Sequence, residues 1–256
     1  MRALVTGAGA RLGAAMAEAL GAQGLDVAVH HATSVEGAEA VAARIRGLGR
    51  RAETVRADLL DLDAVDALVP AAARALGGPL TVLVNNASIF EHDALGTVTR
   101  ESWDRHLVSN LQAPVLLTQA FARQAPRAEG AGEPVAPALV VNMIDQRVRK
   151  LTPEFMSYTL AKSALWTFTR TAAQALAPHV RVNAIGPGPT LRGARQSEAH
   201  FAAQRANTVL GRGADADDVV AALRYLLGAK AVTGQLICVD GGQHLGWRTP
   251  DVRGVE

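Results

Sequence analysis

The chain of 256 residues has the composition of a globular enzyme, with 49% hydrophobic and 20% charged residues. Its net charge of +2 and its scattered arginines argue against a nucleic-acid-binding protein. The single cysteine, Cys238, permits no intrachain disulfide and fits a reducing compartment. No apolar run is long enough to span a membrane and no signal-peptide pattern is present, so we expect a cytoplasmic protein without membrane partners.

Short apolar runs alternate along the chain with longer alanine-rich stretches of helical periodicity. The short runs predict strands at residues 2–6, 26–30, 52–57, 80–85, 138–143, 180–185 and 235–239. The periodic stretches predict helices at residues 12–22, 34–48, 62–76, 103–124, 155–176 and 216–227. Strands that are apolar throughout are typical of a parallel sheet buried on both faces. We therefore predict a single α/β domain over residues 1–256, with a doubly wound, Rossmann-like sheet of about seven parallel strands and helices on both faces.

Two stretches interrupt this alternation. Residues 126–137 are rich in Gly, Pro, Ala and Glu, and they predict a surface excursion between a helix and a strand. Residues 186–213 are too long for a simple connection, begin with Gly-Pro-Gly-Pro, and include a helix-capable piece at 197–207. Because ligands of open parallel sheets bind beyond the carboxyl ends of the strands, we expect residues 186–213 to form a substrate loop.

A glycine turn directly follows the first predicted strand and opens the first predicted helix. Its glycines, Gly7, Gly9 and Gly13, have the spacing Gly-x-Gly-x-x-x-Gly, one residue longer than the common dinucleotide fingerprint. Glycines let backbone amides approach a phosphate closely, and a helix N-terminus favours the negative charge of that phosphate. The turn therefore predicts a dinucleotide site.

The second predicted strand ends without an acidic residue, in the sequence His-His-Ala-Thr-Ser at residues 30–34. A site for NAD usually places Asp or Glu there to accept a hydrogen bond from the ribose 2′-hydroxyl. Arg11 can supply positive charge to a 2′-phosphate, and Thr33 and Ser34 can donate hydrogen bonds to it. We therefore predict NADP (NADPH) rather than NAD. The alternative is that Arg11 is a solvated loop residue and that Ser34 only caps the following helix.

Two more strand ends carry polar side chains. Asp58, followed by Leu59, ends the third predicted strand, where its carboxylate can meet the adenine amino group. A turn or cap role for Asp58 is the alternative. Asn85 and Asn86 end the fourth predicted strand. Two consecutive asparagines indicate a loop that amide groups hold beside the cofactor.

Tyr158 and Lys162 lie four residues apart in a predicted helix, so both side chains leave the same face. A free tyrosine has a pKa of about 10, and a fixed cation nearby lowers that pKa because it favours the phenolate. Such a phenol can exchange a proton with an atom that gains or loses a hydride. The same spacing also occurs on ordinary amphipathic helices, so the pair needs support from the rest of the chain.

That support comes from motifs that occur together in a familiar order: the glycine turn, Asn85-Asn86-Ala87, Asn110, Tyr158-x-x-x-Lys162 and Asn183-x-x-Gly186-Pro187-Gly188. Over nearly its whole length the chain resembles a short-chain dehydrogenase/reductase. The resemblance implies that Tyr158 is the general acid/base, that Lys162 holds the nicotinamide ribose and lowers the tyrosine pKa, and that Asn110 anchors a proton-relay water. It also implies a homotetramer. The expected cofactor contacts are Gly7, Gly9, Arg11, Leu12, Gly13, Thr33, Ser34, Asp58, Leu59, Asn86, Ala87, Ser88, Tyr158, Lys162, Pro187 and Gly188.

One position departs from the family pattern. The family usually has serine thirteen residues before the tyrosine, and this chain has Asp145 there. Aspartate at this place resembles the pteridine reductase branch, which includes dihydromonapterin and dihydrofolate reductases of this fold. The basic glycine turn around Arg11 and the sequence Asn-Asn-Ala-Ser-Ile-Phe at residues 85–90 resemble the same branch, in which the Phe stacks on the pterin. That branch often has Arg where Thr33 stands, which weakens the expected selectivity for the phosphate.

An ionised Asp145 beside Tyr158 would oppose formation of the phenolate. This is a handicap for carbonyl reduction, but it suits a ring C=N, whose nitrogen needs a proton as the hydride arrives. We expect Asp145 and Tyr158 to relay that proton as a coupled pair; alternatively, Asp145 only caps a loop or pairs with Arg147 or Arg149. We expect Phe90 to stack on a flat heterocycle, unless it is a core residue. The expected substrate contacts are Arg11, Ser88, Phe90, Asp145, Tyr158 and Gly188.

The sequence thus predicts an NADPH-dependent reductase of a pterin-like or related heterocyclic C=N or C=O substrate, without a metal ion. A generic short-chain carbonyl or alcohol oxidoreductase, such as a ketoacyl or sugar/ketone reductase, is the first alternative. A dinucleotide-binding sensor without catalysis is the second. The presence of both Tyr158 and Lys162 argues against a sensor, because pure binding does not need both.

Overall fold

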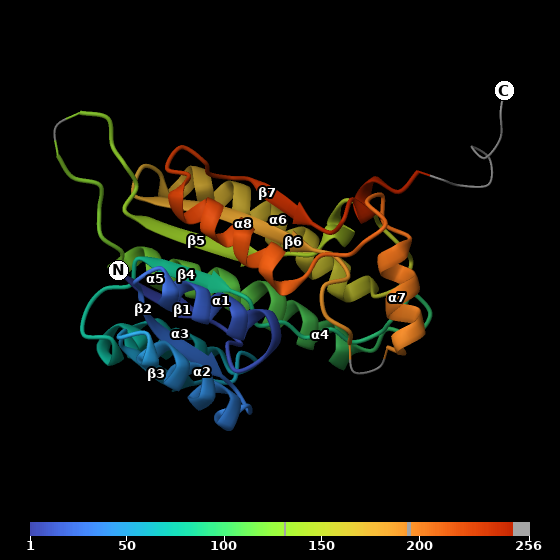
Figure 1. Ribbon diagram of the computed structural model, residues 1–256, viewed down its shortest axis with the longest axis horizontal. Helices are drawn as coiled ribbons and strands as arrows, with labels where there is room; N and C mark the ends of the chain where they lie inside the picture. Colours follow the sequence, from blue (N-terminus) through green and yellow to red (C-terminus); the bar gives the residue numbers. More distant parts are fainter. Residues whose placement is uncertain (131, 194–195, 248–256) are drawn as a thin grey trace.

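Seven parallel strands form one sheet at the centre of the structure, a computed structural model that describes residues 1–130, 132–193 and 196–247 (Figure 1). The strands lie side by side in the order β3-β2-β1-β4-β5-β6-β7, and every neighbouring pair is parallel. The predicted doubly wound fold class is therefore confirmed. In chain order the strands are β1 (Arg2–Val5), β2 (Asp26–His31), β3 (Ala52–Arg56), β4 (Val82–Asn85), β5 (Ala138–Met143), β6 (Val180–Pro187) and β7 (Leu236–Val239).

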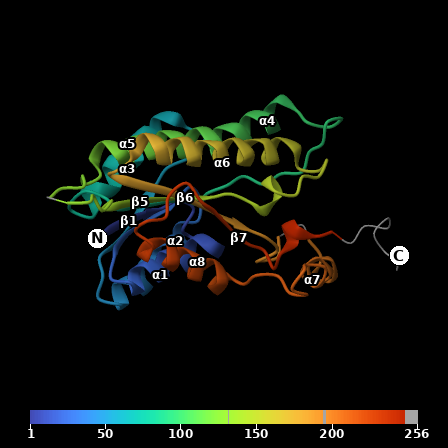
Figure 2. The same cartoon turned by 90° about the horizontal axis from the view of Figure 1, so that it is seen from above.

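Helices cover both faces of the sheet (Figure 2). On one face lie α1 (Arg11–Ala22), α2 (Val35–Gly47) and α8 (Ala216–Gly228), and on the other lie α3 (Leu62–Ala75), α5 (Ala113–Gln124) and α6 (Met156–Leu176). Each set packs its apolar side against the strands in a core of its own: Met16, Leu20 and Leu223 belong to the first, and Leu117 and Phe121 to the second. Burial on both faces explains why the central strands β4 and β5 are largely apolar, whereas the edge strand β3 carries Glu53 and Arg56 and is only partly buried. The short α7 (Glu198–Ala206) lies apart from the sheet and buries no residue.

The long helix predicted at residues 103–124 is interrupted in the structure. It begins as α4 (Arg100–Leu107), where the Thr99 hydroxyl caps the end by accepting the Ser102 N–H at 3.1 Å. A π-helical turn, η1 (Val108–Gln112), then separates α4 from α5. Pro114 has no N–H to donate to the carbonyl of Asn110, so a regular α-helical ladder cannot continue there. The sequence placed Pro114 in the helix but did not predict the interruption.

A second difference concerns the start of β4, which was predicted at residue 80 and begins at Val82. The Gln124 side chain accepts the Leu80 N–H at 2.7 Å and donates to the Leu80 carbonyl at 3.2 Å. Leu80 therefore pairs with the end of α5 instead of a neighbouring strand. A hydrogen bond between residues so far apart in the chain cannot be predicted from a local sequence pattern.

The strand order reverses between β1 and β4, and open α/β sheets bind ligands at such a switch point. The predicted excursion at residues 126–137 contains neither helix nor strand in its described part, and the long connection after β6 carries α7 as expected. Two short 3₁₀ turns, η2 (Gln146–Val148) and η3 (Gln243–Leu245), lie beyond the ends of β5 and β7. Within the described residues, no helix is long and apolar enough to cross a membrane.

Candidate active site

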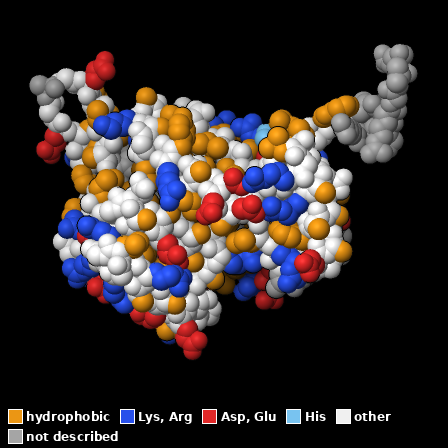
Figure 3. Space-filling model, viewed as in Figure 1, with side chains coloured by type: hydrophobic (Ala, Val, Ile, Leu, Met, Phe, Trp, Pro, Cys, Tyr) orange, Lys and Arg blue, Asp and Glu red, His pale blue; other side chains and the backbone are white. Residues whose placement is uncertain are grey.

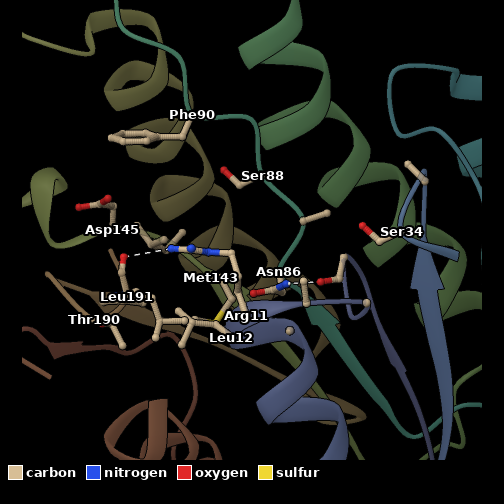
Figure 4. A pocket seen from close by; sticks show the side chains of 18 of the residues that line it. Arg11, Leu12, Ser34, Asn86, Ser88, Phe90, Met143, Asp145, Thr190 and Leu191 are labelled. Carbon is tan, nitrogen blue, oxygen red and sulfur yellow. Dashed lines mark hydrogen bonds between the residues drawn. The ribbon is translucent and has the colours of Figure 1, made fainter. Parts of the chain in front are cut away.

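Two adjoining cavities open beyond the carboxyl ends of β1, β4, β5 and β6. The first, of about 510 Å³, is lined by the glycine turn, the end of β2 and residues from the ends of β4, β5 and β6 (Figure 4). The second, of about 560 Å³, is lined by the turn after β5, the connection after β6 and one side of α7. Five residues line both cavities and mark their junction: Arg11, Phe90, Asp145, Gly188 and Leu191.

The glycine turn has the close packing that a phosphate-binding turn requires. Gly7 has a left-handed φ of 62°, and a Cβ atom on Gly13 would lie 2.1 Å from the Gly7 carbonyl oxygen. Ala10 precedes α1 without a side-chain cap, and the first turn of α1 carries no acidic residue. The N-terminus of α1 therefore presents backbone N–H groups and partial positive charge to the first cavity, as a dinucleotide phosphate needs.

Asn86 holds the glycine turn in place from the end of β4. Its Nδ2 donates to the carbonyl oxygens of Thr6 at 2.8 Å and Gly7 at 3.2 Å. In return the Thr6 hydroxyl accepts the backbone N–H of Asn86 at 2.9 Å and of Ala87 at 3.0 Å. The inference that consecutive asparagines hold a loop beside the nucleotide site is thus supported for Asn86, whereas the part played by Thr6 was missed.

His30 is a second residue whose role the sequence did not reveal. It is buried at the end of β2, where Nδ1 accepts the Gly7 N–H at 3.0 Å and Nε2 donates to the Ala57 carbonyl at 3.1 Å. Burial lowers the pKa of His30 to about 4, so the ring stays neutral and keeps Nδ1 free to accept. His30 thus ties the glycine turn to the end of β3.

The end of β2 has the character predicted for a phosphate-selective site. Thr33 and Ser34 line the first cavity, and no acidic side chain stands among residues 30–34. Ser34 is the N-cap residue of α2, as predicted, but its hydroxyl makes no capping hydrogen bond. Asp58 and Leu59 do not line the cavity. Asp58 instead accepts the Leu60 N–H at 3.0 Å, which is the turn role considered as the alternative to an adenine contact.

Arg11 joins the glycine turn to the connection after β6. Its backbone is left-handed, with a φ of 54°, which is unusual for a residue with a side chain. The guanidinium donates to the carbonyl oxygens of Leu191 at 3.0 Å and Arg192 at 2.9 Å, and Figure 4 shows it reaching across the cavity toward Leu191. Arg11 is therefore not a free loop residue, and it stands at the border of both cavities.

Tyr158 and Asp145 form the hydrogen bond on which the catalytic prediction depends. The Tyr158 hydroxyl donates to Asp145 Oδ2 at 3.0 Å, while Asp145 Oδ1 accepts the Arg147 N–H at 2.8 Å and caps η2. Asp145 thus caps the loop, as the alternative reading expected, and it also contacts the tyrosine; its relay of a proton stays a prediction. Tyr158 is 6% exposed, and it lines the first cavity together with Asp145.

The charges around Tyr158 favour the protonated phenol. Burial, followed by the negative charge of Asp145, raises the pKa of Tyr158 well above 10, and burial also raises the pKa of Asp145. Burial lowers the pKa of Lys162 to about 8, and the Lys162 ammonium donates to the Met143 carbonyl at 2.7 Å. The expected opposition from Asp145 is therefore found, and the net shift of the Tyr158 pKa is upward; that Lys162 lowers this pKa stays a prediction.

Phe90 faces the junction of the two cavities and is 47% exposed, so it is not a core residue (Figure 4). Its ring stacks on Phe155 with centroids 4.3 Å apart and meets the Tyr158 ring edge-on at 4.7 Å. Ser88, two residues earlier, lines the first cavity. A flat aromatic wall beside a phenol and a carboxyl group can hold a planar heterocycle within reach of proton donors.

Asn110 and Gly188 hold the loops on either side of this junction. Asn110 is fully buried in η1, where Oδ1 accepts the Ile89 N–H and Nδ2 donates to the Ile89 carbonyl, both at 2.8 Å. Its side chain thus fixes the loop that carries Ser88 and Phe90; its relay of protons through a water stays a prediction. Pro187 and Gly188 both line the first cavity. A Cβ atom on Gly188 would lie 2.5 Å from Asp240 Cβ, so this close approach of the loop to Asp240 requires glycine.

Comparison with known proteins identifies the class. A family model described as enoyl-(acyl carrier protein) reductase matches residues 7–244. The chain belongs to the short-chain dehydrogenase/reductase family, and it is an NAD(P)-dependent oxidoreductase.

Particular relatives within that family act on different substrates. The structure of the alternative dihydrofolate reductase 1 FolM from Brucella suis in complex with NADP is similar to this chain, with 45% identity, 98% of each chain covered and a TM-score of 0.91. A probable galactose dehydrogenase from Rhizobium meliloti is 34% identical over 93% of each chain. The D-erythrulose reductase of Gallus gallus is 34% identical over 94% of each chain. The suspected pteridine reductase branch is thus among the similar proteins, together with sugar and ketone oxidoreductases.

Proposed function

We propose that this protein is an NADPH-dependent reductase of a pterin-like or related heterocyclic substrate. The observation that carries the proposal is the hydrogen bond from Tyr158 to Asp145 at the junction of the two cavities, beside the exposed ring of Phe90. The similarity to FolM from Brucella suis, described above, supports the same substrate class. A family member that reduces simple ketones has no evident use for a carboxylate that resists phenolate formation.

The residues of the first cavity fit NADPH, which supplies the hydride when it is bound. The glycine turn and the open N-terminus of α1 suit its pyrophosphate, and the buried Lys162 suits its nicotinamide ribose. Arg11, Thr33 and Ser34 suit a 2′-phosphate, since no carboxylate at the end of β2 would repel it. The remaining residues proposed to line the cofactor are Gly7, Gly9, Leu12, Gly13, Asn86, Ala87, Ser88, Pro187 and Gly188.

The proton half of the reaction belongs to Tyr158 and Asp145. The raised pKa keeps Tyr158 protonated at neutral pH but makes the phenol alone a weak donor, so a protonated Asp145 replaces the proton that Tyr158 gives to a substrate atom that gains a hydride. Asp145 holds that hydroxyl in one orientation through the 3.0 Å hydrogen bond. Since burial also favours the protonated form of Asp145, the two groups titrate as a pair and can deliver a proton to a ring nitrogen.

The second cavity suits the substrate. Phe90 provides a flat wall, and Arg11, Ser88 and Gly188 stand around the junction where the reacting ring would lie. We propose that the described part of residues 191–207, which carries α7, closes over the substrate. Because α7 buries none of its residues, it can move without loss of core packing.

The decisive experiment measures NADPH oxidation by the purified protein with dihydropteridines, including dihydrofolate, and with simple ketones. We expect turnover of a dihydropteridine, and a loss of about 10²-fold or more in kcat in Asp145→Ala, the range that a positioned acid or base contributes. Asp66→Ala removes an exposed carboxylate of α3 outside both cavities and serves as the matched control. Ready ketone reduction by Asp145→Ala, with no pterin turnover by the unaltered protein, would refute the proposal.

The second candidate function is a generic carbonyl or sugar reductase, favoured by the similarity to the galactose dehydrogenase and the D-erythrulose reductase. Sugar or ketone turnover that is unchanged in Asp145→Ala would support it. Tight NADPH binding without oxidation in the presence of pterins, quinones or ketones would instead indicate a sensor. We also propose, from the family resemblance, a single domain, a homotetramer and a cytoplasmic location; sedimentation analysis tests the second of these.

A further inference from the structure

Asp93 is a buried carboxylate that neither cavity contains. It lies in the connection between β4 and α4, yet it is only 2% exposed, because it packs against the N-terminus of α6, the helix that carries Tyr158. This helix has no side-chain cap of its own. Its N-cap residue is Phe155, whose backbone is left-handed with a φ of 58°. The first N–H groups of α6 must therefore find partners elsewhere.

Asp93 supplies those partners. Its carbonyl oxygen accepts the N–H groups of Phe155 at 2.8 Å and Met156 at 3.3 Å. Its carboxylate accepts the N–H of Ser157 at 3.1 Å through Oδ1 and the Ser157 hydroxyl through Oδ2. One residue, distant in sequence, thus caps three consecutive N–H groups at the helix end where negative charge is most favourable. Ser157 directly precedes Tyr158.

His106 completes the arrangement from α4. It is fully buried; its Nε2 accepts the Glu91 N–H at 3.1 Å, and its Nδ1 lies 2.6 Å from the Ser157 hydroxyl. Because Nε2 accepts and burial lowers the pKa of His106, the neutral ring donates from Nδ1. The hydrogen bonds therefore run in one direction, from His106 to Ser157 to Asp93. They fasten the loop after β4 and α4 to the start of α6.

The contacts of Asp93 also hold the aromatic side chains that line the proposed substrate cavity. Phe155, whose N–H bonds to Asp93, stacks on Phe90 at 4.3 Å, and Phe90 meets Tyr158 at 4.7 Å. The carbonyl of Asp93 thus contacts Phe155, which stacks on the wall, and its carboxylate contacts Ser157, which precedes the proton donor. Misplacement of reacting groups by about 1 Å can cost roughly 10²-fold in rate, so such a contact affects turnover directly.

We propose that Asp93, acting through Ser157 and His106, is a positioning residue that holds the Tyr158 hydroxyl and the Phe90 ring in register with each other. The inference rests on the proposed function, in which Tyr158 donates the proton and Phe90 holds the substrate. Asp93, Ser157 and His106 line neither cavity, so they act through Tyr158 and Phe90 and not on the substrate itself. The rival account is that Asp93 is a cap that contributes to stability alone.

Kinetics separate these accounts when Asp93→Ala is compared with Asp61→Ala. Asp61 caps α3 by accepting the N–H groups of Asp63 at 3.0 Å and Ala64 at 3.3 Å, and it lines neither cavity. We expect Asp93→Ala to lower kcat about 10²-fold with an unchanged KM for NADPH, and Asp61→Ala to lower the melting temperature while leaving kcat unchanged. Asp93→Asn keeps an oxygen for the Ser157 N–H and should recover part of the rate.

A second readout does not depend on any substrate. The chain has two tyrosines, Tyr158 and Tyr225, so in a Tyr225→Phe background the ring-carbon NMR signal of labelled tyrosine reports Tyr158 alone. The phenol should stay un-ionised through the highest pH at which the protein remains folded. With Asp93→Ala or Ser157→Ala, water should reach the start of α6 and the phenol should ionise at lower pH; with Asp61→Ala it should not.

The outcomes are distinct. If the unaltered protein shows no turnover but the Tyr158 titration changes in Asp93→Ala, the proposed function is refuted and the positioning role is supported. Turnover by the unaltered protein with the same kcat and the same Tyr158 titration in Asp93→Ala would overturn the positioning role. If Asp93→Ala does not fold, Asp93→Asn and Ser157→Ala, which retain most of the cap, carry both measurements.

Discussion

At the scale of single residues, the site is defined by which charges surround Tyr158 and which are absent from the end of β2. Asp145 accepts a hydrogen bond from the Tyr158 hydroxyl, and burial together with the charge of Asp145 keeps the phenol protonated; the Lys162 ammonium donates to the Met143 carbonyl. At the other end of the first cavity, Thr33 stands where a carboxylate would select an unphosphorylated ribose. We propose that Asp145 thus governs the protonation of Tyr158, the proton donor, and that Thr33 favours NADPH over NADH.

Replacing Thr33 with aspartate tests the second of these assignments. In Thr33→Asp the new carboxylate should repel the 2′-phosphate and accept a hydrogen bond from a 2′-hydroxyl, because both would lie beside it. We expect the ratio of kcat/KM for NADPH to that for NADH to fall by about tenfold or more, which corresponds to about 1.4 kcal/mol. Ala43→Asp, at an exposed position of α2 outside the cavity, adds the same charge and should leave the ratio unchanged. If the ratio is unaltered in Thr33→Asp, the 2′-phosphate does not bind beside Thr33.

At the scale of elements, the glycine turn is positioned by three neighbours at once. Asn86 holds it from β4, His30 holds it from β2, and α2 packs directly against it. The contact with α2 depends on Gly37, because a Cβ atom there would lie 2.3 Å from the Gly9 carbonyl oxygen. Gly37 was not recognised from the sequence, where it is an isolated glycine in a helical pattern.

Two glycines of the same helix provide a matched comparison. Gly37→Ala should destabilise the protein by about 1–3 kcal/mol, the usual cost of overpacking, and should weaken NADPH binding because the glycine turn must shift. Gly47→Ala meets no atom within 4 Å and should be neutral or stabilise by up to about 1 kcal/mol through helix propensity. Chemical denaturation and NADPH titration of both variants check this. Equal effects of the two substitutions would show that α2 does not constrain the turn.

At the scale of the whole molecule, the sheet encloses a few polar groups at its carboxyl edge while the surface carries mixed charge. Figure 3 shows basic and acidic side chains interspersed over the face it presents, in keeping with the net charge of +2. Lys162, like Asp93, Arg181 and Asp240, departs from this distribution, since it is 2% exposed. An ammonium group at such a place reduces the stability of the folded protein whenever it is protonated.

The Lys162 pKa gives this cost a definite pH dependence. The folded protein holds the amine at a pKa of about 8, below the usual 10.5, so the unfolded chain binds more protons between these values. The stability of the native protein relative to Lys162→Met should therefore rise with pH from about 8 to 10.5, by about 3 kcal/mol in all. Denaturant unfolding of both proteins across that range measures it. A flat difference between the two proteins would contradict the lowered pKa of Lys162.

The sequence by itself determined the parallel sheet, the glycine turn and the Tyr158–Lys162 pair, because these depend on local periodicity and fixed spacing. It also located Asp145 beside Tyr158 by its position in the family pattern. The tertiary structure alone decided where the Lys162 ammonium points, that His30 and Gly37 support the glycine turn, and that Asp93 caps α6. Each of these depends on side chains that meet across strands and loops far apart in the chain. The burial of Lys162 and His30 then sets their pKa values, and this burial cannot be predicted from a local sequence pattern.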